Sequence, residues 1–183
     1  MPGKVVYAGD AVYESEQGSY YSLLQADLEP ACRVEPTSTE DVVAIVKLAG
    51  EEECPFALRS GGHMTFKGVL LLLSTITLPD LSIKGASNIG PEGFTIDTTN
   101  LTHLELSEDK ASIAVGTGNR WGAVFDLLTP QNLTVVGGRD PYVGVGGYLL
   151  GGACFTHDVN LRLFLTSYYR RNFVLQLPEG FRW

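Results

Sequence analysis

Arg59-Ser60-Gly61-Gly62-His63 follows directly on a short apolar run, Pro55-Phe56-Ala57-Leu58. The apolar run predicts a buried strand. Two adjacent glycines allow a sharp turn at the end of this strand, because they have no Cβ atom to clash. Such a turn points successive backbone N–H groups into one concavity, which suits a phosphate. With His63 at its rim, the loop predicts a nucleotide-type cofactor site.

A second glycine-rich segment runs from Val136 to Gly152, and seven of its seventeen residues are glycine. Glycine at this density provides positive φ angles or lets another group approach the backbone closely. A Gly-Gly-His turn alone is more often an ordinary loop with a solvated histidine. Two glycine-rich loops in one small chain instead fit an extended ligand with more than one contact region, such as a dinucleotide.

Motifs of other cofactor and catalytic sites are missing from the sequence. No G-x-G-x-x-G opens a helix, so a Rossmann NAD site is unsupported. No P-loop motif occurs, and no G-x-S-x-G nucleophile elbow occurs. The spacing of cysteines and histidines matches no zinc pattern.

The two loops together resemble the flavin-binding domain of the berberine bridge enzyme-like oxidoreductases, within the wider p-cresol methylhydroxylase (PCMH) and vanillyl-alcohol oxidase superfamily. The resemblance runs from about Tyr20 to about Cys154. It is strongest in Glu35-Pro36-Thr37-Ser38, in Arg59 to His63 and in Val143 to Gly152. It implies an α+β fold of the PCMH type that forms the N-terminal half of a two-domain flavoprotein, with the C-terminal substrate domain absent.

The resemblance also implies the roles of individual residues. The first loop would hold the diphosphate of FAD, and His63 would be joined covalently to the 8α-methyl of the isoalloxazine ring. Some members add a second link through a cysteine; the matching position here is Asp140, so at most one link is expected. No metal ligand or catalytic residue is assigned. The expected cofactor-binding residues are Arg59, Ser60, Gly61, Gly62, His63, Gly138, Val143, Gly144, Gly146, Gly147 and Gly151.

Two segments depart from the family pattern. Residues 69–85 (VLLLLSTITLPDLSIKG) are an insertion whose removal restores the usual spacing after His63. We interpret it as a retained intron translated in frame, and the alternative is a genuine loop insertion. Residues 156–183 do not align and are expected to be out-of-frame or intron-derived. The predicted organisation is a lead-in over residues 1–27, the FAD-binding domain over 28–155 and an unaligned tail over 156–183.

Local patterns predict several helices and strands. Ser38 and Asp41 have the spacing of a capping box, with Asp in place of the usual Glu. The helix that follows would end near Glu53 and bury an apolar stripe. Further predicted elements are a strand over 94–97, a hairpin of 104–106 with 112–115, a helix from Trp121 that Pro130 stops, and a strand over 134–136.

Composition narrows the class of protein. The chain has 183 residues, 44% hydrophobic and 19% charged, as globular proteins do. A net charge of −8 argues against non-specific binding to nucleic acid. The apolar part of 69–85 is too short to span a bilayer. No signal peptide is visible, which places the protein in the cytoplasm by default. Cys32 and Cys54 either form a disulfide or are two small buried residues.

The function implied by the resemblance is FAD-dependent oxidation of an organic alcohol, sugar or secondary metabolite. Hydride would pass to flavin N5, and dioxygen would reoxidise the flavin. The expected partners are therefore FAD and a small organic substrate. Two alternatives stay open: a catalytically inactive flavin-binding fragment, and a non-functional product of a wrongly assembled gene.

Overall fold

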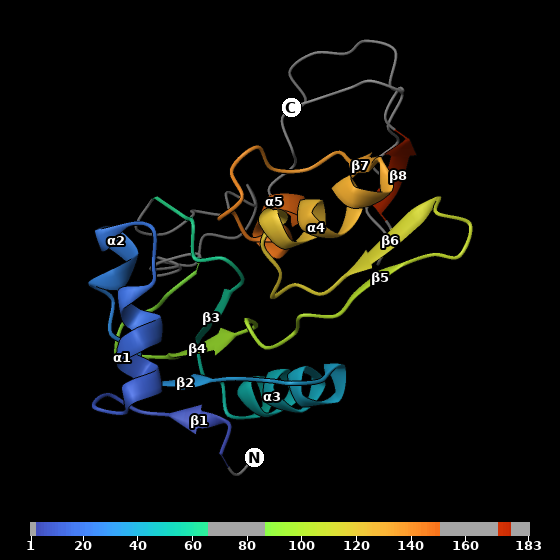
Figure 1. Cartoon of the computed structure of the whole chain (residues 1–183). Helices are drawn as coiled ribbons and strands as arrows, with labels where there is room; N and C mark the ends of the chain where they lie inside the picture. The colour runs from blue at the N-terminus through green and yellow to red at the C-terminus, as the bar shows by residue number, and fades with distance from the viewer. Residues whose placement is uncertain (1–2, 66–86, 151–171, 177–183) are drawn as a thin grey trace, which may run out of the picture. The chain divides into compact units, whose positions relative to one another are not determined.

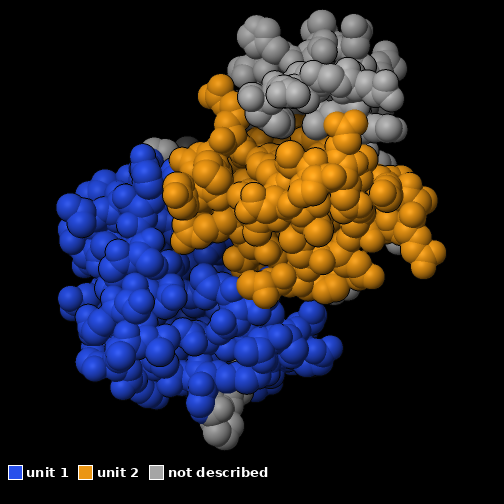
Figure 2. All heavy atoms as spheres, viewed as in Figure 1, with its two compact units in different colours: residues 1–101 blue, residues 102–183 orange. Residues whose placement is uncertain are grey.

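The computed structural model describes residues 3–65, 87–150 and 172–176 (Figure 1). Segment 69–85 and most of the tail after residue 155 lie outside these ranges, so the two predictions made for them are not addressed. The described chain divides into two units, residues 1–101 and residues 102–183, which Figure 2 colours blue and orange. The boundary falls inside the predicted 28–155 domain.

The first unit is built on a four-stranded sheet with the strand order β1-β2-β4-β3 (Figure 1). β4 is parallel to both neighbours, and Phe94 lies in register with Cys32 on one side and Phe56 on the other. β1 pairs antiparallel with β2 at the edge. The strands are β1 (Val5–Val6), β2 (Cys32–Val34), β3 (Phe56–Arg59) and β4 (Phe94–Asp97).

Helix α3 (Thr39–Glu51) begins with the predicted capping box. The Asp41 backbone N–H donates to Ser38 Oγ over 3.2 Å, and the Ser38 N–H donates to the Asp41 carboxylate over 3.1 Å. Two orphan N–H groups of the first turn are satisfied in this way. Ile45 and Ala49 are buried, and Ile45 forms a small core with Val34 and Ile96 of the sheet.

Strand β3 is present where the apolar run predicted it, but it is not buried on both faces. Ala57 and Arg59 are buried, whereas Phe56 and Leu58 are 38% and 39% exposed. β3 lies at the edge of its sheet, and alternate residues of a strand point to opposite faces. The apolar run therefore marks a one-sided edge strand.

Residues before Thr37, for which the sequence predicted no helix or strand, contain four elements. Besides β1 and β2, there are two short helices, α1 (Ala11–Gly18) and α2 (Leu23–Ala26). Tyr13 on α1 is 2% exposed and donates a hydrogen bond to the carbonyl of Pro30 over 2.9 Å. This segment is part of the packed first unit.

The second unit contains a sheet with the strand order β5-β6-β8-β7. β5 (Leu104–Leu106) and β6 (Ser112–Val115) form the predicted antiparallel hairpin. β7 (Leu133–Val135) precedes the second glycine-rich segment, as predicted. β8 (Asn172–Gln176) lies within the unaligned tail, for which the sequence predicted no strand.

Trp121 is the centre of the second unit's core. It begins helix α4 (Trp121–Leu128), which passes at Thr129 into the short 3-10 helix η1 (Thr129–Gln131), which contains Pro130. Trp121 is fully buried. The core around it consists of Ile113, Val124, Leu128, Leu133, Val135 and Val145. None of the helices in the described ranges is both long enough and apolar enough to cross a bilayer.

Candidate functional site

The loop Ser60–His63 leaves the end of β3 at a position where only glycine fits. Gly62 has φ +66°, a left-handed conformation that residues with a side chain rarely adopt. A Cβ atom on Gly62 would lie 2.9 Å from Tyr20 Cδ1 and 3.1 Å from Arg59 Nε. Both conformation and space therefore require glycine here, as the sequence predicted for a sharp turn.

The turn buries two backbone donors that the described residues leave unpaired. Gly61 and Gly62 are buried. In the described part of the chain, the Gly62 carbonyl accepts from the Tyr21 N–H over 3.2 Å, but neither glycine N–H donates to any group. Buried backbone donors are nearly always paired. Among the described residues, the loop thus has two adjacent N–H groups that could take an acceptor.

Tyr20 and Tyr21, which connect α1 to α2, hold this loop from two sides. The ring of Tyr20 packs against Gly62, and its hydroxyl donates to the Ser87 carbonyl over 2.7 Å. The ring of Tyr21 stacks on the imidazole of His63, with centroids 3.9 Å apart and planes 13° apart. The loop geometry therefore depends on residues about forty positions earlier in the sequence.

Arg59 directs its two Nη groups away from the loop, whereas Nε lies beside Gly62 and is buried without a hydrogen-bond partner among the described residues. Its side chain is fully buried, and Nη1 pairs with Asp97 Oδ2 at 3.0 Å and Glu16 Oε2 at 2.7 Å. Nη2 donates to Ser19 Oγ over 2.5 Å, and the guanidinium lies 4.2 Å from the centroid of the Tyr20 ring. The positive charge of Arg59 is thus already matched inside the protein.

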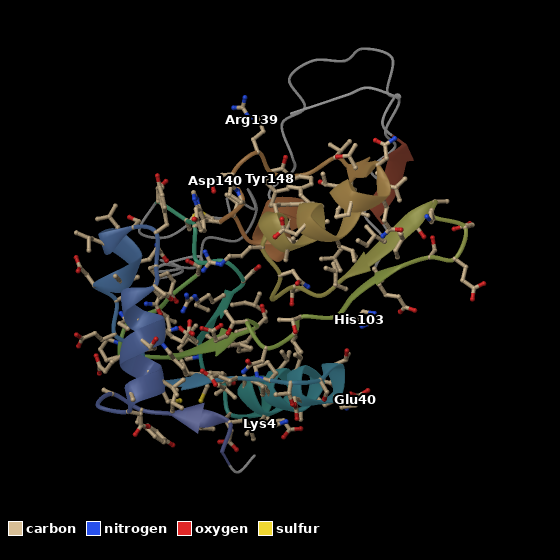
Figure 3. The ribbon with its side chains drawn as sticks, in the orientation of Figure 1. Lys4, Glu40, His103, Arg139, Asp140 and Tyr148 are labelled. Atoms are coloured by element: carbon tan, nitrogen blue, oxygen red, sulfur yellow. The ribbon has the colours of Figure 1, made fainter. Side chains whose placement is uncertain are left out.

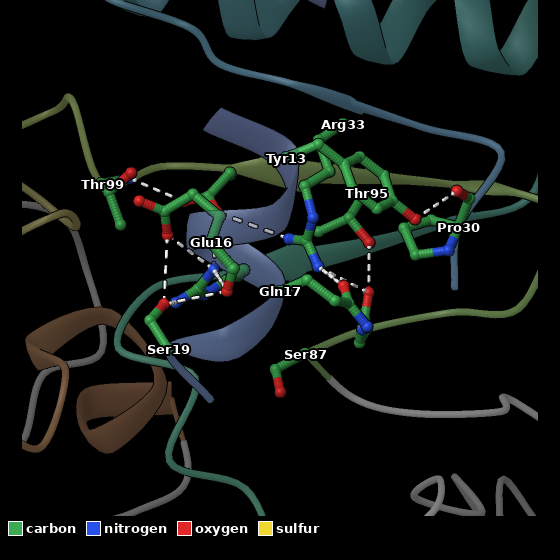
Figure 4. Close-up of polar contacts among 12 residues, drawn as sticks. Tyr13, Glu16, Gln17, Ser19, Pro30, Arg33, Ser87, Thr95 and Thr99 are labelled. Atoms are coloured by element: carbon green, nitrogen blue, oxygen red, sulfur yellow. Dashed lines mark hydrogen bonds and ion pairs between the residues drawn. The ribbon is translucent and has the colours of Figure 1, made fainter. Parts of the chain in front are cut away.

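A second buried arginine shares the same carboxylate. Arg33 Nη1 lies 3.6 Å from Asp97 Oδ2, and both side chains are fully buried. Figure 4 shows how Arg33 also donates to Gln17 on α1, while the hydroxyl of Tyr13 contacts Pro30. Two buried cations around one buried anion require further polar partners. The network therefore joins β2, β3 and β4 to helix α1.

Burial raises the pKa of three groups near this network. Burial is the largest cause for Tyr20, and the positive charges of Arg33 and Arg59 oppose it. The pKa of Glu35 is raised by burial first, and then by the negative charges of Asp97 and Glu16. Burial likewise raises the pKa of Tyr13. The tyrosines are therefore neutral hydrogen-bonding phenols at neutral pH.

The second glycine-rich segment begins with two glycines that pack against Trp121. A Cβ atom on Gly137 would lie 2.3 Å from Trp121 Cε3, and one on Gly138 would lie 2.6 Å from Trp121 Cδ1. The close approach that these glycines permit is to the indole ring. Figure 3 labels Arg139, Asp140 and Tyr148 in this part of the second unit. Asp140 Oδ1 accepts from the Tyr142 N–H over 2.8 Å and so fixes a turn.

The remaining expected residues lie in and before helix α5 (Val145–Leu150). The Val143 carbonyl accepts from the Trp121 N–H over 3.0 Å, and Gly144 forms a β-bridge with Arg120. Gly146 and Gly147 are in the first turn of α5, and a Cβ atom on Gly147 would meet open space. Gly151 lies outside the described residues. The expected residues thus form two groups, one in each unit.

The described cysteines are not joined. Cys32 and Cys54 are both free; Cys32 is half-buried and Cys54 is exposed. The possible disulfide between them is therefore absent, and Cys54 is not a buried residue either. In the ranges that the structure describes, no group of three His, Cys, Asp or Glu side chains could hold a metal ion.

The sequence did not identify three residues that shape the first loop: Asp97, Glu16 and Tyr21. Asp97 ends a predicted strand and is fully buried in the structure, and a buried carboxylate requires a cationic partner. The same requirement could have suggested Arg59 as the partner of Asp97. No sequence signal indicated Glu16.

With the fold and both loops described, comparison with known proteins identifies the class. The chain matches the FAD binding domain family over residues 30–160, and it belongs to that family. FAD-dependent monooxygenase macF of Penicillium terrestre is 39% identical over 155 residues, which cover 84% of this chain and 26% of that relative. FAD-dependent monooxygenase yanF of Aspergillus niger is 38% identical over 125 residues, or 68% of this chain and 19% of that relative.

Solved structures show the same fold. Physcomitrella patens BBE-like 1 superimposes with a TM-score of 0.59 at 22% identity, over 80% of this chain and 28% of that one. Phl p 4, a grass pollen allergen with glucose dehydrogenase activity, gives 0.61 at 19% identity, over 83% and 29%. The predicted α+β fold of a PCMH-type FAD-binding domain is therefore confirmed. The chain spans about a quarter of the length of macF.

Proposed function

We propose that this chain binds FAD as part of a flavin-dependent oxidoreductase, with the diphosphate held by the loop Ser60–His63. The observation that carries the proposal is the pair of buried, unpaired N–H groups of Gly61 and Gly62, at a turn that excludes any side chain. Adjacent backbone donors in such a turn form an anion-binding concavity. The residues present therefore fit a diphosphate.

Arg59 has a different role in this proposal from the one implied by resemblance. Its Nη1 group is paired with Asp97 and Glu16, so the charge is largely balanced by these carboxylates, and only Nε beside Gly62 lacks a partner among the described residues. Arg59 instead fixes the end of β3, where its carbonyl accepts from the Thr98 N–H over 2.9 Å. In this proposal the backbone N–H groups of the loop bind the diphosphate, and Arg59 fixes the position of the backbone at the end of β3.

His63 is the residue that we propose is joined to the flavin. Its imidazole would supply the nitrogen lone pair for a link to the 8α carbon, and the two electrons and two protons released by that link would pass to dioxygen. When bound, FAD supplies a redox-active ring that accepts a hydride from an organic substrate. The protein orients this ring and excludes competing reactions.

The second glycine-rich segment would contact another part of the cofactor. Val143 and Gly144 are anchored to Trp121 and Arg120 by backbone contacts, which gives the segment a defined shape. Gly147 has open space where a Cβ atom would project, so a ligand can approach its backbone closely. Gly146 and Gly151 belong to the same proposal. Gly138, which packs on Trp121, would contribute through its backbone.

The substrate remains an organic alcohol, sugar or secondary metabolite. The names of the relatives support flavin-dependent oxidoreduction: macF and yanF are FAD-dependent monooxygenases, and Phl p 4 has glucose dehydrogenase activity. Turnover by this chain is a separate question from binding. Substrate-dependent bleaching of the flavin in the absence of dioxygen would demonstrate it.

The test of the binding proposal is visible absorption combined with intact mass of the purified chain. We expect a yellow protein whose mass gain of one FAD survives denaturation. His63→Ala should keep bound FAD but lose the covalent mass gain. A colourless wild-type protein that takes up no added FAD would overturn the proposal. Bound FAD without a mass gain would overturn the His63 link alone.

A further inference from the structure

The ring of Tyr21 lies flat on the imidazole of His63, with centroids 3.9 Å apart and planes inclined by 13°. The two residues are also coupled through the backbone, since the Tyr21 N–H donates to the carbonyl of Gly62 over 3.2 Å. One ring and one hydrogen bond thus attach Tyr21 to the same turn. We propose that Tyr21 is a positioning residue that sets the plane of the His63 imidazole for attachment to the flavin. This inference rests on the His63 link proposed above.

Tyr21 covers a face of the imidazole and not its edge, although His63 Nε2 itself is a buried atom. The lone pair of an imidazole nitrogen lies in the plane of the ring, so a partner stacked on the face does not cover it. Tyr21 restricts rotation of the imidazole out of this plane while both ring nitrogens stay at its edge. A bond to the 8α carbon forms along the lone pair, and holding that direction raises the frequency of productive encounters.

The ring of Tyr21 lies largely outside the core of the first unit. Its side chain is 64% exposed, whereas its neighbour Tyr20 is 8% exposed. Tyr20 supports the fold: it donates to the Ser87 carbonyl and packs against Gly62 and Arg59. An exposed aromatic ring contributes little to a core. The two adjacent tyrosines therefore have different roles: Tyr20 supports the loop, and Tyr21 orients His63.

The test separates attachment from binding. The full chain is loaded with saturating FAD, and the first-order rate of covalent attachment is followed by intact mass, while the dissociation constant of non-covalent FAD is measured on a His63→Ala background. We expect Tyr21→Leu to slow attachment about fivefold, the effect of losing one aromatic pair, with the dissociation constant unchanged. Tyr21→Phe should attach at the wild-type rate, because it keeps the ring.

Tyr7→Leu is the matched control, because Tyr7 is also an exposed tyrosine of the first unit, 58% exposed. In the described residues Tyr7 has no ring contact with His63, so its rate should stay at wild type. A second measurement needs no flavin: the carbon-bound protons of His63 should shift upfield in the wild type and in Tyr21→Phe, and lose that shift in Tyr21→Leu.

The possible outcomes separate the positioning role of Tyr21 from the covalent link at His63. If the wild type attaches FAD and Tyr21→Leu attaches it equally fast, the positioning role is overturned and the His63 link stands. If Tyr21→Phe is as slow as Tyr21→Leu, the hydroxyl acts and the stacking argument fails. If the wild type binds FAD but never attaches it, the His63 link fails and the inference falls with it.

Discussion

Gly62 combines two constraints that are independent of each other. Its φ of +66° disfavours any side chain, and its position against Tyr20 leaves no room for one. The first constraint follows from the backbone and the second from packing. A substitution at Gly62 thus tests the loop geometry directly.

Gly62→Ala is expected to destabilise the protein by about 1–3 kcal/mol, because it forces a left-handed conformation on a residue with a Cβ atom, and to weaken FAD binding. Urea unfolding and flavin titration measure the two effects. Gly50→Ala is the control: Gly50 is in α3, with nothing within 4 Å of a Cβ atom, so alanine should stabilise slightly. Equal stability of both variants would contradict the description of the turn.

The two described cysteines should differ in reactivity. Cys54 is exposed, whereas Cys32 is half-buried and burial raises the pKa of its thiol. Thiolate is the reactive form, so a raised pKa leaves less of it at neutral pH. We expect a thiol reagent to label Cys54 well before Cys32, as read by peptide mass. Cys54→Ser should remove the fast phase; a fast phase that persists and maps to Cys32 would contradict this.

Among the elements of the first unit, β2, β3, β4 and α1 depend on one carboxylate. Asp97 lies 3.0 Å from Arg59 Nη1 and 3.6 Å from Arg33 Nη1, and all three side chains are fully buried. Asp97→Asn would leave two buried cations without their shared anion. We expect a loss of about 3–5 kcal/mol in urea unfolding. Asp27→Asn, at an exposed aspartate of the same unit, should have little effect; a comparable loss there would argue against the network.

Helix α3 should make the protein sensitive to acid. Asp41 accepts from Lys4 Nζ, from the Thr37 N–H over 2.9 Å and from the Ser38 N–H over 3.1 Å. These bonds hold the pKa of Asp41 far below its ordinary 3.8. A depressed folded pKa stabilises the protein above the unfolded pKa, and this stability is lost as pH falls below it.

The free energy of unfolding should therefore decline below about pH 4 in the wild type, and the decline should be smaller in Asp41→Asn. Urea titrations over a pH series measure it. Glu40→Gln, one residue earlier in the same helical turn, is the control and should decline like the wild type. The reverse ranking would assign the acid sensitivity to Glu40.

Elements with a local signal could be predicted from the sequence, and elements held by distant contacts could not. The capping box located α3, and the alternation of Phe94-Thr95-Ile96-Asp97 matched β4 to the residue. Helix α1 lacks a clear apolar stripe and is held by Tyr13 and by Gln17, which bonds Arg33. β2 has a buried arginine at its centre, which no strand pattern predicts.

In the site, the glycines of the turn were predictable, but the partner of Arg59 was not, because Asp97 is far away in the sequence.

For the whole molecule, the net charge predicts how the protein interacts with charged surfaces. The net charge of −8 gives the chain an anionic character at neutral pH. We expect no retention on heparin or immobilised DNA at near-physiological salt, and retention on an anion exchanger. Measured binding to DNA that weakens with added salt would contradict this expectation.

The position of β4 in its sheet has a consequence for biosynthesis. β4 lies between β2 and β3, yet the ribosome makes it after both of them. Until residue 97 has emerged, neither β2 nor β3 can meet its parallel neighbour. Lengthening the chain between β3 and β4 is thermodynamically mild, since each doubling of a loop costs only about 0.6 kcal/mol. A longer connection prolongs the time for which two strand edges stay open on the nascent chain, when chaperones and neighbouring polypeptides compete for them.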